Sequence, residues 1–131
     1  MTVANWNIKT TLHPTRRGVS NATTANSSGA AVDLLGYINP GGRALKGLLS
    51  VGAVTSTGHL AVRFQESSTS GESGFADISG AAFTATGDTA TTGSEEIVFR
   101  ASKRYVRAIG AASDTANIDY AVYVLAEKCL T

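Results

Sequence analysis

The sequence of 131 residues contains one cysteine, Cys129, so no internal disulfide can form and the chain does not need an oxidising compartment. Charged residues are also scarce, and eleven Lys and Arg against ten Asp and Glu leave a formal charge of +1. Proteins that coat nucleic acid usually carry a strong excess of cations, so this balance argues against nucleic acid as a partner. A chain of this length is expected to form one domain with a core of its own.

Long apolar runs are missing as well. No stretch approaches the roughly 20 apolar residues that a membrane-spanning helix requires. The first residues, MTVANWNIKTTLHP, lack the unbroken apolar run of a secretion signal. We therefore expect no membrane partner and synthesis in the cytoplasm.

Residue types that carry catalysis or bind metals are few and poorly spaced. The two histidines, His13 and His59, do not stand at metal-ligand spacing with Cys or carboxylates. No G-x-S-x-G motif is present, and NPGGRALKG does not match the phosphate-binding loop pattern. Glu95 and Glu96 are adjacent, so on a strand they would point to opposite faces instead of forming a catalytic pair. We expect no catalytic residues, no metal site, no cofactor and no enzymatic activity.

From residue 30 onward the chain consists of short apolar stretches separated by turn residues. HLAVRFQE (59–66) alternates strictly, with Leu60, Val62 and Phe64 on one face, as is typical of a half-buried strand. RALKGLLSVGAVT (43–55) would also suit a short helix, but its two glycines favour one or two strands with a glycine bend. The other predicted strands are AVDLLGY, FADIS, AAFTATG, EEIVFRA, RYVRAIGAA and IDYAVYVLAEK.

About seven or eight short strands without a long helical pattern predict an all-β sandwich or barrel, and we expect an antiparallel, jelly-roll-like β-sandwich. Its core should be light, because Ala, Gly, Ser and Thr are abundant. Most of the stability is then expected from a few large side chains. These are Leu60, Val62, Phe64, Phe75, Ile78, Phe83, Ile97, Phe99, Val106, Ile109, Tyr120, Val122 and Val124.

Residues 1–29 differ from the rest in having little apolar periodicity, and we treat them as an extended N-terminal arm ahead of a sandwich domain of residues 30–131. The few apolar residues of the arm cannot fold alone, so a strand within it must borrow a partner. Exposed aromatic and Arg side chains are favoured at protein interfaces, although a disordered terminus is the alternative. The candidate partner-binding residues are Trp6, Ile8, Leu12, Pro14, Arg16 and Arg17.

The stretch SKRYVRAIG (102–110) places three cations within a few positions. Strand alternation would divide it into one face with Lys103, Tyr105, Arg107 and Ile109 and another with Arg104, Val106 and Ala108. The cations would not gather on one face, and only Tyr105 could stack on a base, which argues against a nucleic-acid site. We expect Arg104 and Arg107 to lie instead against carboxylates such as Glu66 or Asp33, or against loop carbonyls.

Three short motifs follow one another along the chain: V-D-L-x-G-Y, a strand ending in Q-E-S before a polar loop and F-x-D-[VI], and K-R-Y-[VIL]-R. In this combination, which spans roughly residues 12–126, the sequence resembles a family of small virion proteins from the capsid-gene region of tailed bacteriophages. The matching positions are Val32, Asp33, Leu34, Gly36 and Tyr37; Gln65, Glu66 and Ser67; Phe75, Asp77 and Ile78; and Lys103, Arg104, Tyr105, Val106 and Arg107.

The resemblance implies a capsid decoration or cement protein, an auxiliary head protein on the outer face of the capsid. Such a protein binds the major capsid protein, stabilises the shell by bridging its subunits, and is expected to self-associate as a trimer or dimer. The resemblance further implies that seven residues of the motifs support the fold. These are Asp33, Tyr37, Gln65, Glu66, Arg104, Tyr105 and Arg107.

Two departures from the family pattern leave the contact surface open. The loop 68–74 is longer and richer in serine than usual, and the start of the chain around Trp6 does not align. Two other interpretations also stay open, a head-tail junction or head-completion protein and a carbohydrate-binding module on the virion. For the second, a platform of exposed tyrosines would be needed among Tyr37, Tyr105, Tyr120 and Tyr123.

Overall fold

The computed structural model describes residues 8–21, 26–35, 44–55, 59–71, 73–84, 93–113 and 117–129, and the side chains within 29–35, 45–52, 60–71, 73–84, 93–111 and 120–126. These residues form the strands β1 (Ile8–Asn21), β2 (Asn26–Ser28), β3 (Val32–Asp33), β4 (Ala44–Thr55), β5 (His59–Ser67), β6 (Ala76–Ala82), β7 (Gly93–Arg100), β8 (Tyr105–Ser113) and β9 (Asn117–Cys129). Within the described ranges, no helix is long and apolar enough to cross a membrane.

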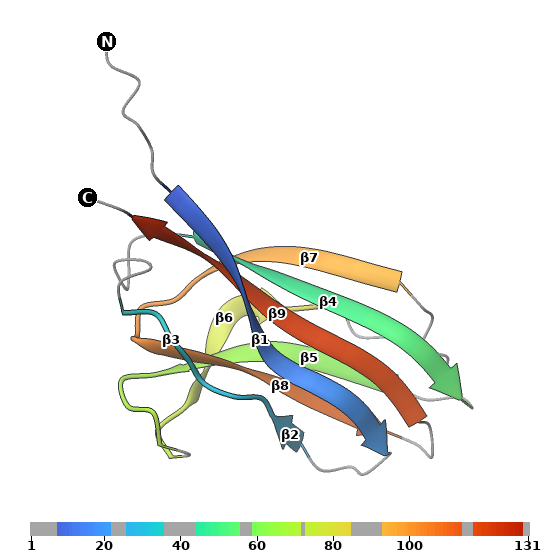
Figure 1. Cartoon of the computed structure of the whole chain (residues 1–131). Helices are drawn as coiled ribbons and strands as arrows, with labels where there is room; N and C mark the ends of the chain where they lie inside the picture. The colour runs from blue at the N-terminus through green and yellow to red at the C-terminus, as the bar shows by residue number, and fades with distance from the viewer. Residues whose placement is uncertain are drawn as a thin grey trace.

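The strands form two antiparallel sheets that pack face to face (Figure 1). Sheet A has the order β1-β9-β4-β7, and sheet B has the order β2-β8-β5-β6, with the short β3 also paired to β8. Seven strands have seven residues or more, four of them in sheet A and three in sheet B. The predicted antiparallel β-sandwich is therefore confirmed.

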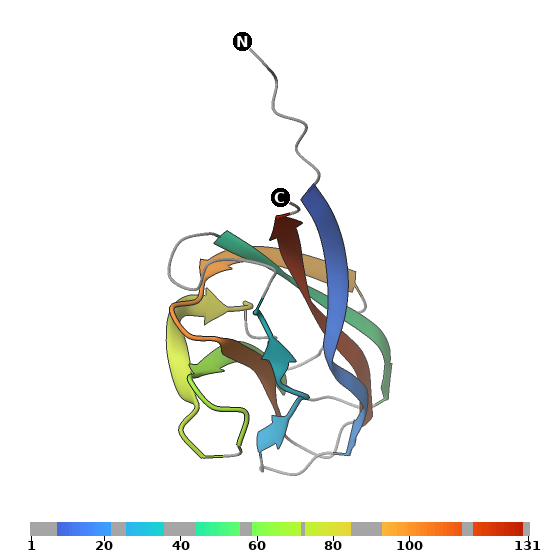
Figure 2. The ribbon, with the colours of Figure 1, turned by 60° about the vertical axis from the view of Figure 1, so that its left-hand side comes forward.

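The order of pairing is nested. β1 pairs with β9, β2 and β3 pair with β8, β4 pairs with β7, and β5 pairs with β6. This nested pairing is that of one long antiparallel hairpin whose strands are divided between two sheets, which is the jelly-roll arrangement. Most connections pass from one sheet to the other, and Figure 2 shows the strands arranged in two layers.

The core lies between the sheets and depends on strand alternation. On β5, Leu60, Val62 and Phe64 are buried, as their spacing predicts. The Phe64 ring stacks on Phe99 of sheet A with 4.5 Å between ring centroids. Gly47 of β4 makes room for this ring, because a Cβ there would lie 2.5 Å from Phe64 Cε2. Gly47 therefore marks a close approach of the two sheets instead of a bend.

The stretch 43–55 was expected to form one or two strands with a glycine bend, and it contains one strand, whose register is irregular between Val51 and Val54, around Gly52. Two other local predictions need correction. Among the described residues of the segment AVDLLGY, only Val32–Asp33 is a strand, and FADIS and AAFTATG share the single strand β6. Apolar pattern alone cannot place such boundaries, because the backbone pairing that defines a strand comes from distant parts of the chain.

Most of the predicted core residues belong to the buried core cluster, with three kinds of exception. Ile78 and Ile97 are only partly buried against the core cluster. Ile109 is 3% exposed but lies outside that cluster, since its register partner is the outward-facing Arg63. Phe75 is half-buried and contacts Arg107, not the core. The core also includes residues that the sequence analysis did not select: Val32, Leu34, Leu45, Leu49, Val51, Ala81, Ala101, Ala108 and Ala126.

The segment 1–29 contains β1 and β2. β1 is an edge strand of sheet A and pairs antiparallel with β9 from Ile8 opposite Cys129 to Asn21 opposite Asn117. β2 pairs with β8. The strand in the predicted arm thus has its partner within the same chain, at the opposite end of the sequence.

Candidate functional site

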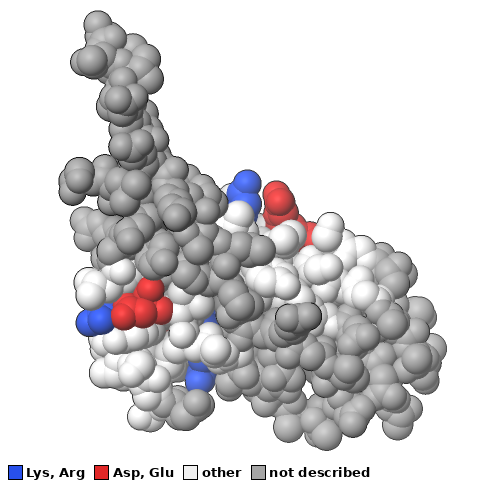
Figure 3. Space-filling view, viewed as in Figure 1, with Lys and Arg blue, Asp and Glu red and all other residues white. Residues whose placement is uncertain are grey.

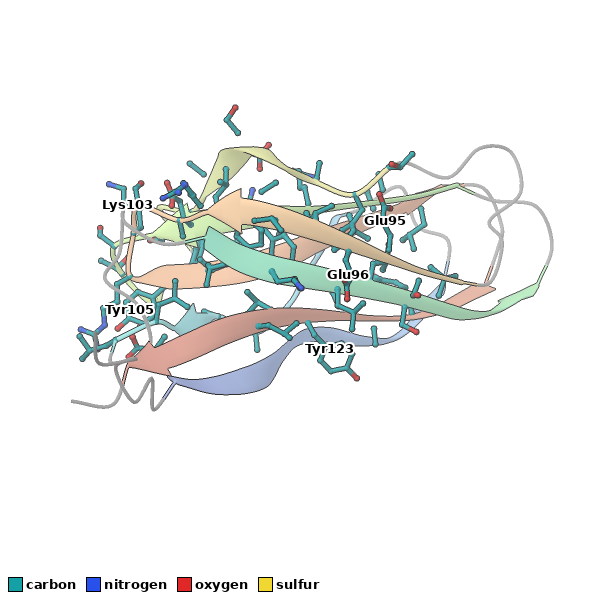
Figure 4. The ribbon with its side chains drawn as sticks, turned by 90° about the horizontal axis from the view of Figure 1, so that it is seen from above. Glu95, Glu96, Lys103, Tyr105 and Tyr123 are labelled. Carbon is teal, nitrogen blue, oxygen red and sulfur yellow. The ribbon has the colours of Figure 1, made fainter. Side chains whose placement is uncertain are left out.

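The motifs of the bacteriophage resemblance come together in the structure. They lie on β3, at the end of β5, around the start of β6 and at the start of β8, and these strands are neighbours in sheet B. Figure 4 shows Lys103 and Tyr105 at this same end of the sandwich. The motif side chains form a polar network there, which is the candidate functional site.

The first part of the network is an ion pair between Asp33 and Arg104. Arg104 donates from Nε and Nη2 to the two carboxylate oxygens of Asp33, each at 2.8 Å. The Arg104 hydrogen bonds, together with one from the Leu35 N–H, lower the pKa of Asp33 to about 2. The same pairing raises the pKa of Arg104. Both side chains are about half exposed, so the pair fixes geometry more than it adds stability.

This pair confirms the expectation that Arg104 lies against a carboxylate, but the predicted face of Arg104 was wrong. Strand alternation placed it with Val106 and Ala108, which are fully buried in the core. β8 begins only at Tyr105, so Arg104 belongs to the preceding bend and its side chain reaches solvent. In addition, Arg104 O accepts a hydrogen bond from the N–H of Leu34, which ties the bend to the end of β3.

The second part is Glu66, which binds the backbone of the bend before β8. Its carboxylate accepts hydrogen bonds from Ser102 N at 2.6 Å, Ser102 Oγ at 2.8 Å and Lys103 N at 3.2 Å. Glu66 was expected to meet an arginine, and it caps backbone N–H groups instead. The carboxylate thereby satisfies donors that the bend leaves outside the sheet ladder.

The third part runs across the outer face of sheet B. Gln65 Oε1 accepts from Arg107 Nε and Nη2 at 3.1 and 3.0 Å, and Gln65 Nε2 donates to Asp77 Oδ1 at 2.8 Å. Arg63 Nε donates to the same Asp77 oxygen at 2.8 Å. The hydrogen bonds from Gln65 and then Arg63 lower the pKa of Asp77. The printed hydrogen bonds of Arg107 thus go to the side-chain amide oxygen of Gln65, a type of partner that the sequence analysis did not name.

The loop between β5 and β6 folds over this network. The Arg107 guanidinium carbon lies 4.1 Å from the centroid of the Phe75 ring, a cation–π contact. Ser67 is buried, and its Oγ accepts a hydrogen bond from Thr69 N at 3.1 Å, which starts the turn of the loop. Gly74 has a φ of +93°, which an L side chain rarely adopts, and it lets the chain return to place Phe75.

The described side chains of this network join β3, β5, β6 and β8 and the bend before β8. Among the described residues, no three His, Cys, Asp or Glu side chains are grouped so as to hold a metal ion. On the face drawn in Figure 3, acidic and basic atoms of the described surface lie beside one another in small groups. Two cations of SKRYVRAIG have partners within the chain: Arg104 donates to Asp33, and Arg107 donates to Gln65.

The remaining predicted residues lie elsewhere. Trp6 and Tyr37 are outside the described residues. Ile8, Leu12, Pro14, Arg16 and Arg17 lie on β1, opposite Cys129, Leu125, Tyr123, Val122 and Ala121 of β9, and the register shifts between Pro14 and Arg16. His13 is on β1 in sheet A and His59 begins β5 in sheet B.

Sequence reasoning missed two members of the network, Arg63 and Ser102. It named Phe75 as a motif position but expected it in the core. The alternation of β5 could have identified Arg63, because it shares the outward face with Gln65. Nothing local to Ser102 or Phe75 indicates a partner on another strand.

Comparisons with known proteins identify no relative. No family model, no curated protein and no solved structure matches the chain.

Proposed function

We propose that this protein is a structural virion protein that binds the outer surface of a bacteriophage capsid and stabilises it by bridging major capsid protein subunits. One observation supports the proposal: the motifs that carry the resemblance, separated by up to 71 positions, contact one another in a single network. Matches that arose independently by chance would have no reason to be neighbours in the fold. The network therefore favours a shared architecture, and the function is inferred from that resemblance.

A capsid-binding protein needs a surface that gains from contact with several subunits, because specific protein interfaces usually bury about 1,200 to 2,000 Å². We assign this contact to the free edge of β1 and to the residues before it, with Trp6, Ile8, Leu12, Pro14, Arg16 and Arg17 as candidates. β1 is at one edge of sheet A, so its outer backbone groups can accept a strand from a partner. Many weak contacts on a symmetric shell would then act together through avidity.

Deletion of residues 2–7 tests this contact. A longer deletion would remove β1 and expose β9, whereas residues 2–7 precede β1. We expect the shortened chain to keep its thermal unfolding transition and to lose binding to capsids that lack the protein, as measured by co-sedimentation. Normal occupancy by the shortened chain would contradict the assignment of the contact.

The copy number in purified virions tests the function itself. A decoration protein should be present in numbers comparable to the major capsid protein, as measured by quantitative mass spectrometry. A single ring of copies at one vertex would identify a head-tail junction or head-completion protein instead. Binding of the isolated protein to a glycan array, without capsid binding, would favour the carbohydrate-binding alternative.

A further inference from the structure

β1 is an edge strand of sheet A, and its backbone register identifies the groups that face away from the sheet. Among the described strands it pairs with β9 alone, from Ile8 opposite Cys129 to Asn21 opposite Asn117. Figure 1 shows β1, in blue, lying along β9. An edge of this kind presents main-chain N–H and C=O groups to another strand, and proteins either block it or use it.

Pro14 indicates which residues of β1 direct these groups outward. In an antiparallel pair, the N–H and C=O of successive residues point alternately to the partner strand and away from it. Pro14 has no N–H, and a proline within a sheet stands where that group would face outward or at a bulge. It lies opposite Tyr123, and the register from Ile8 to Pro14 is regular. The alternation therefore directs the backbone groups of Ile8, Thr10 and Leu12 outward as well.

The irregular register after Pro14 ends this row. Between Pro14 opposite Tyr123 and Arg16 opposite Val122, Thr15 has no partner in the register of β9. A bulge of this kind shifts the alternation by one residue, so the outward positions beyond it begin at Arg17. Pro14 itself offers no donor. A straight second strand can therefore follow β1 on one side of the bulge only, and Ile8–His13 is the side that continues from the residues before β1.

Charge is divided unevenly along the chain, and β1 carries the basic part. Residues 1–29 contain Lys9, Arg16 and Arg17, all on β1, and no Asp or Glu, which gives a formal charge of +3. The other eight Lys and Arg and all ten Asp and Glu lie in residues 30–131, which leave a formal charge of −2. Two copies of β1 side by side would bring like charges together, whereas an acidic strand would be attracted.

We propose that the edge of β1 at Ile8–His13 binds an extended acidic segment of its partner by strand addition. The backbone groups of Ile8, Thr10 and Leu12 are the template, and Pro14 ends it. This inference rests on the proposed function, because it names the chemistry of the capsid segment that the β1 edge would take. Main-chain hydrogen bonds recognise an extended backbone of any sequence, and the positive charge of β1 favours acidic side chains on it.

Proline substitutions at adjacent positions test the register. Thr10→Pro should remove an N–H from the free edge, whereas Thr11→Pro should remove one from the ladder with β9. We expect Thr10→Pro to keep a thermal unfolding transition close to that of the native chain and Thr11→Pro to unfold at a lower temperature. Equal losses in the two variants would show that the N–H of Thr10 does not face outward.

A peptide titration tests the chemistry of the partner without the capsid. The probe is a synthetic peptide in which Glu alternates with Val, added to the full chain and followed by amide NMR. Resonances of Ile8, Thr10 and Leu12 should shift, and their hydrogen exchange should slow. The matched peptide with Lys in place of Glu should cause neither change. An equal response to both peptides, no response at β1, or tighter binding of a DNA oligonucleotide at these residues would overturn the proposal.

Capsids that lack the protein separate this inference from the proposed function. Arg17→Glu should weaken co-sedimentation by roughly tenfold at low salt, because it reverses a charge beside the template. Lys46→Glu is the matched control, since it makes the same change on β4, which β9 separates from β1, and it should bind normally. Unchanged capsid binding by Arg17→Glu and by Thr10→Pro would overturn this inference and leave the proposed function standing. A native chain that takes the acidic peptide at β1 but binds no capsid would contradict the proposed function alone.

Discussion

The two sheets share one core but differ on their outer faces. On sheet B, the polar side chains of β5, β6 and β8 bind one another, with Gln65 joined to both Arg107 and Asp77. On sheet A, the described outward side chains of β4 and β7 include one ion pair, at 3.9 Å, beside the exposed Val98. Figure 4 shows Tyr123 projecting from β9 of sheet A.

This difference indicates how the two faces are used. Polar groups that already have partners within the chain gain little from a second molecule, because new contacts must first break existing ones. A face with weak internal bonds and exposed apolar groups gains more when water is excluded. The proposed capsid contact at β1 therefore lies at an edge of sheet A, while the described side chains of sheet B bind one another.

The largest effect is expected in the core that the two sheets share. Phe64→Ala should reduce the free energy of unfolding by about 3–5 kcal/mol, because it removes a fully buried ring that stacks on Phe99. Phe75→Ala is the matched control, since this ring is half-buried outside the core and should cost clearly less. Urea denaturation measures both, and equal losses would contradict the distinction between core and outer face.

The next largest effect compares the stability contributed by a side chain of the sheet B network, Glu66, with that contributed by the ion pair of Glu96 on sheet A. Glu66→Ala should cost about 1–3 kcal/mol, because it leaves the backbone N–H groups of Ser102 and Lys103 without their acceptor. The same change on sheet A, Glu96→Ala, removes one long ion pair and should cost much less. Hydrogen exchange should accelerate at the amides of residues 102 and 103 in the first variant alone. Unchanged exchange there would show that the cap is not formed in solution.

Sequence reasoning succeeded where structure is determined by alternation within one segment. The buried face of β5, with Leu60, Val62 and Phe64, follows directly from its period of two. Arg104 was also expected to lie against a carboxylate such as Glu66 or Asp33, or against loop carbonyls, and its partner is Asp33. Local pattern was sufficient in these cases because each depends on residue type more than on the path of the chain.

Features that depend on the path of the chain could not be predicted. β1 pairs with β9 across almost the whole sequence, and its own residues show no apolar period that would indicate a strand. Phe75 looks like a core residue by composition, and only the return of the loop after Gly74 places it over Arg107. Nor does any residue pattern identify β7 as an edge strand, because strand order is a property of the complete topology.

Acid should weaken sheet B through Asp33. Its pKa is about 2 in the folded protein and 3.8 as the reference value, so the ionised carboxylate stabilises the fold above pH 3.8 and this contribution is lost as the pH falls towards 2. Asp33→Asn should therefore lower stability at neutral pH slightly and reduce the loss between these two pH values. Urea midpoints of both proteins at several pH values measure this difference. Identical pH profiles would mean that Asp33 is not paired with Arg104 in solution.

The smallest effect is expected from the ion pair on sheet A. Lys46→Ala should change the free energy of unfolding by no more than about 0.5 kcal/mol, because both partners are largely in solvent, where water and salt screen the attraction. Arg63→Ala on sheet B is the matched comparison: its pair with Asp77 is shorter, at 2.8 Å, and the Arg63 side chain is less exposed. Urea denaturation at low and high salt should show a larger and more salt-resistant loss for Arg63→Ala. A greater loss for Lys46→Ala would contradict the assignment of sheet B as the face whose described side chains stabilise the fold more.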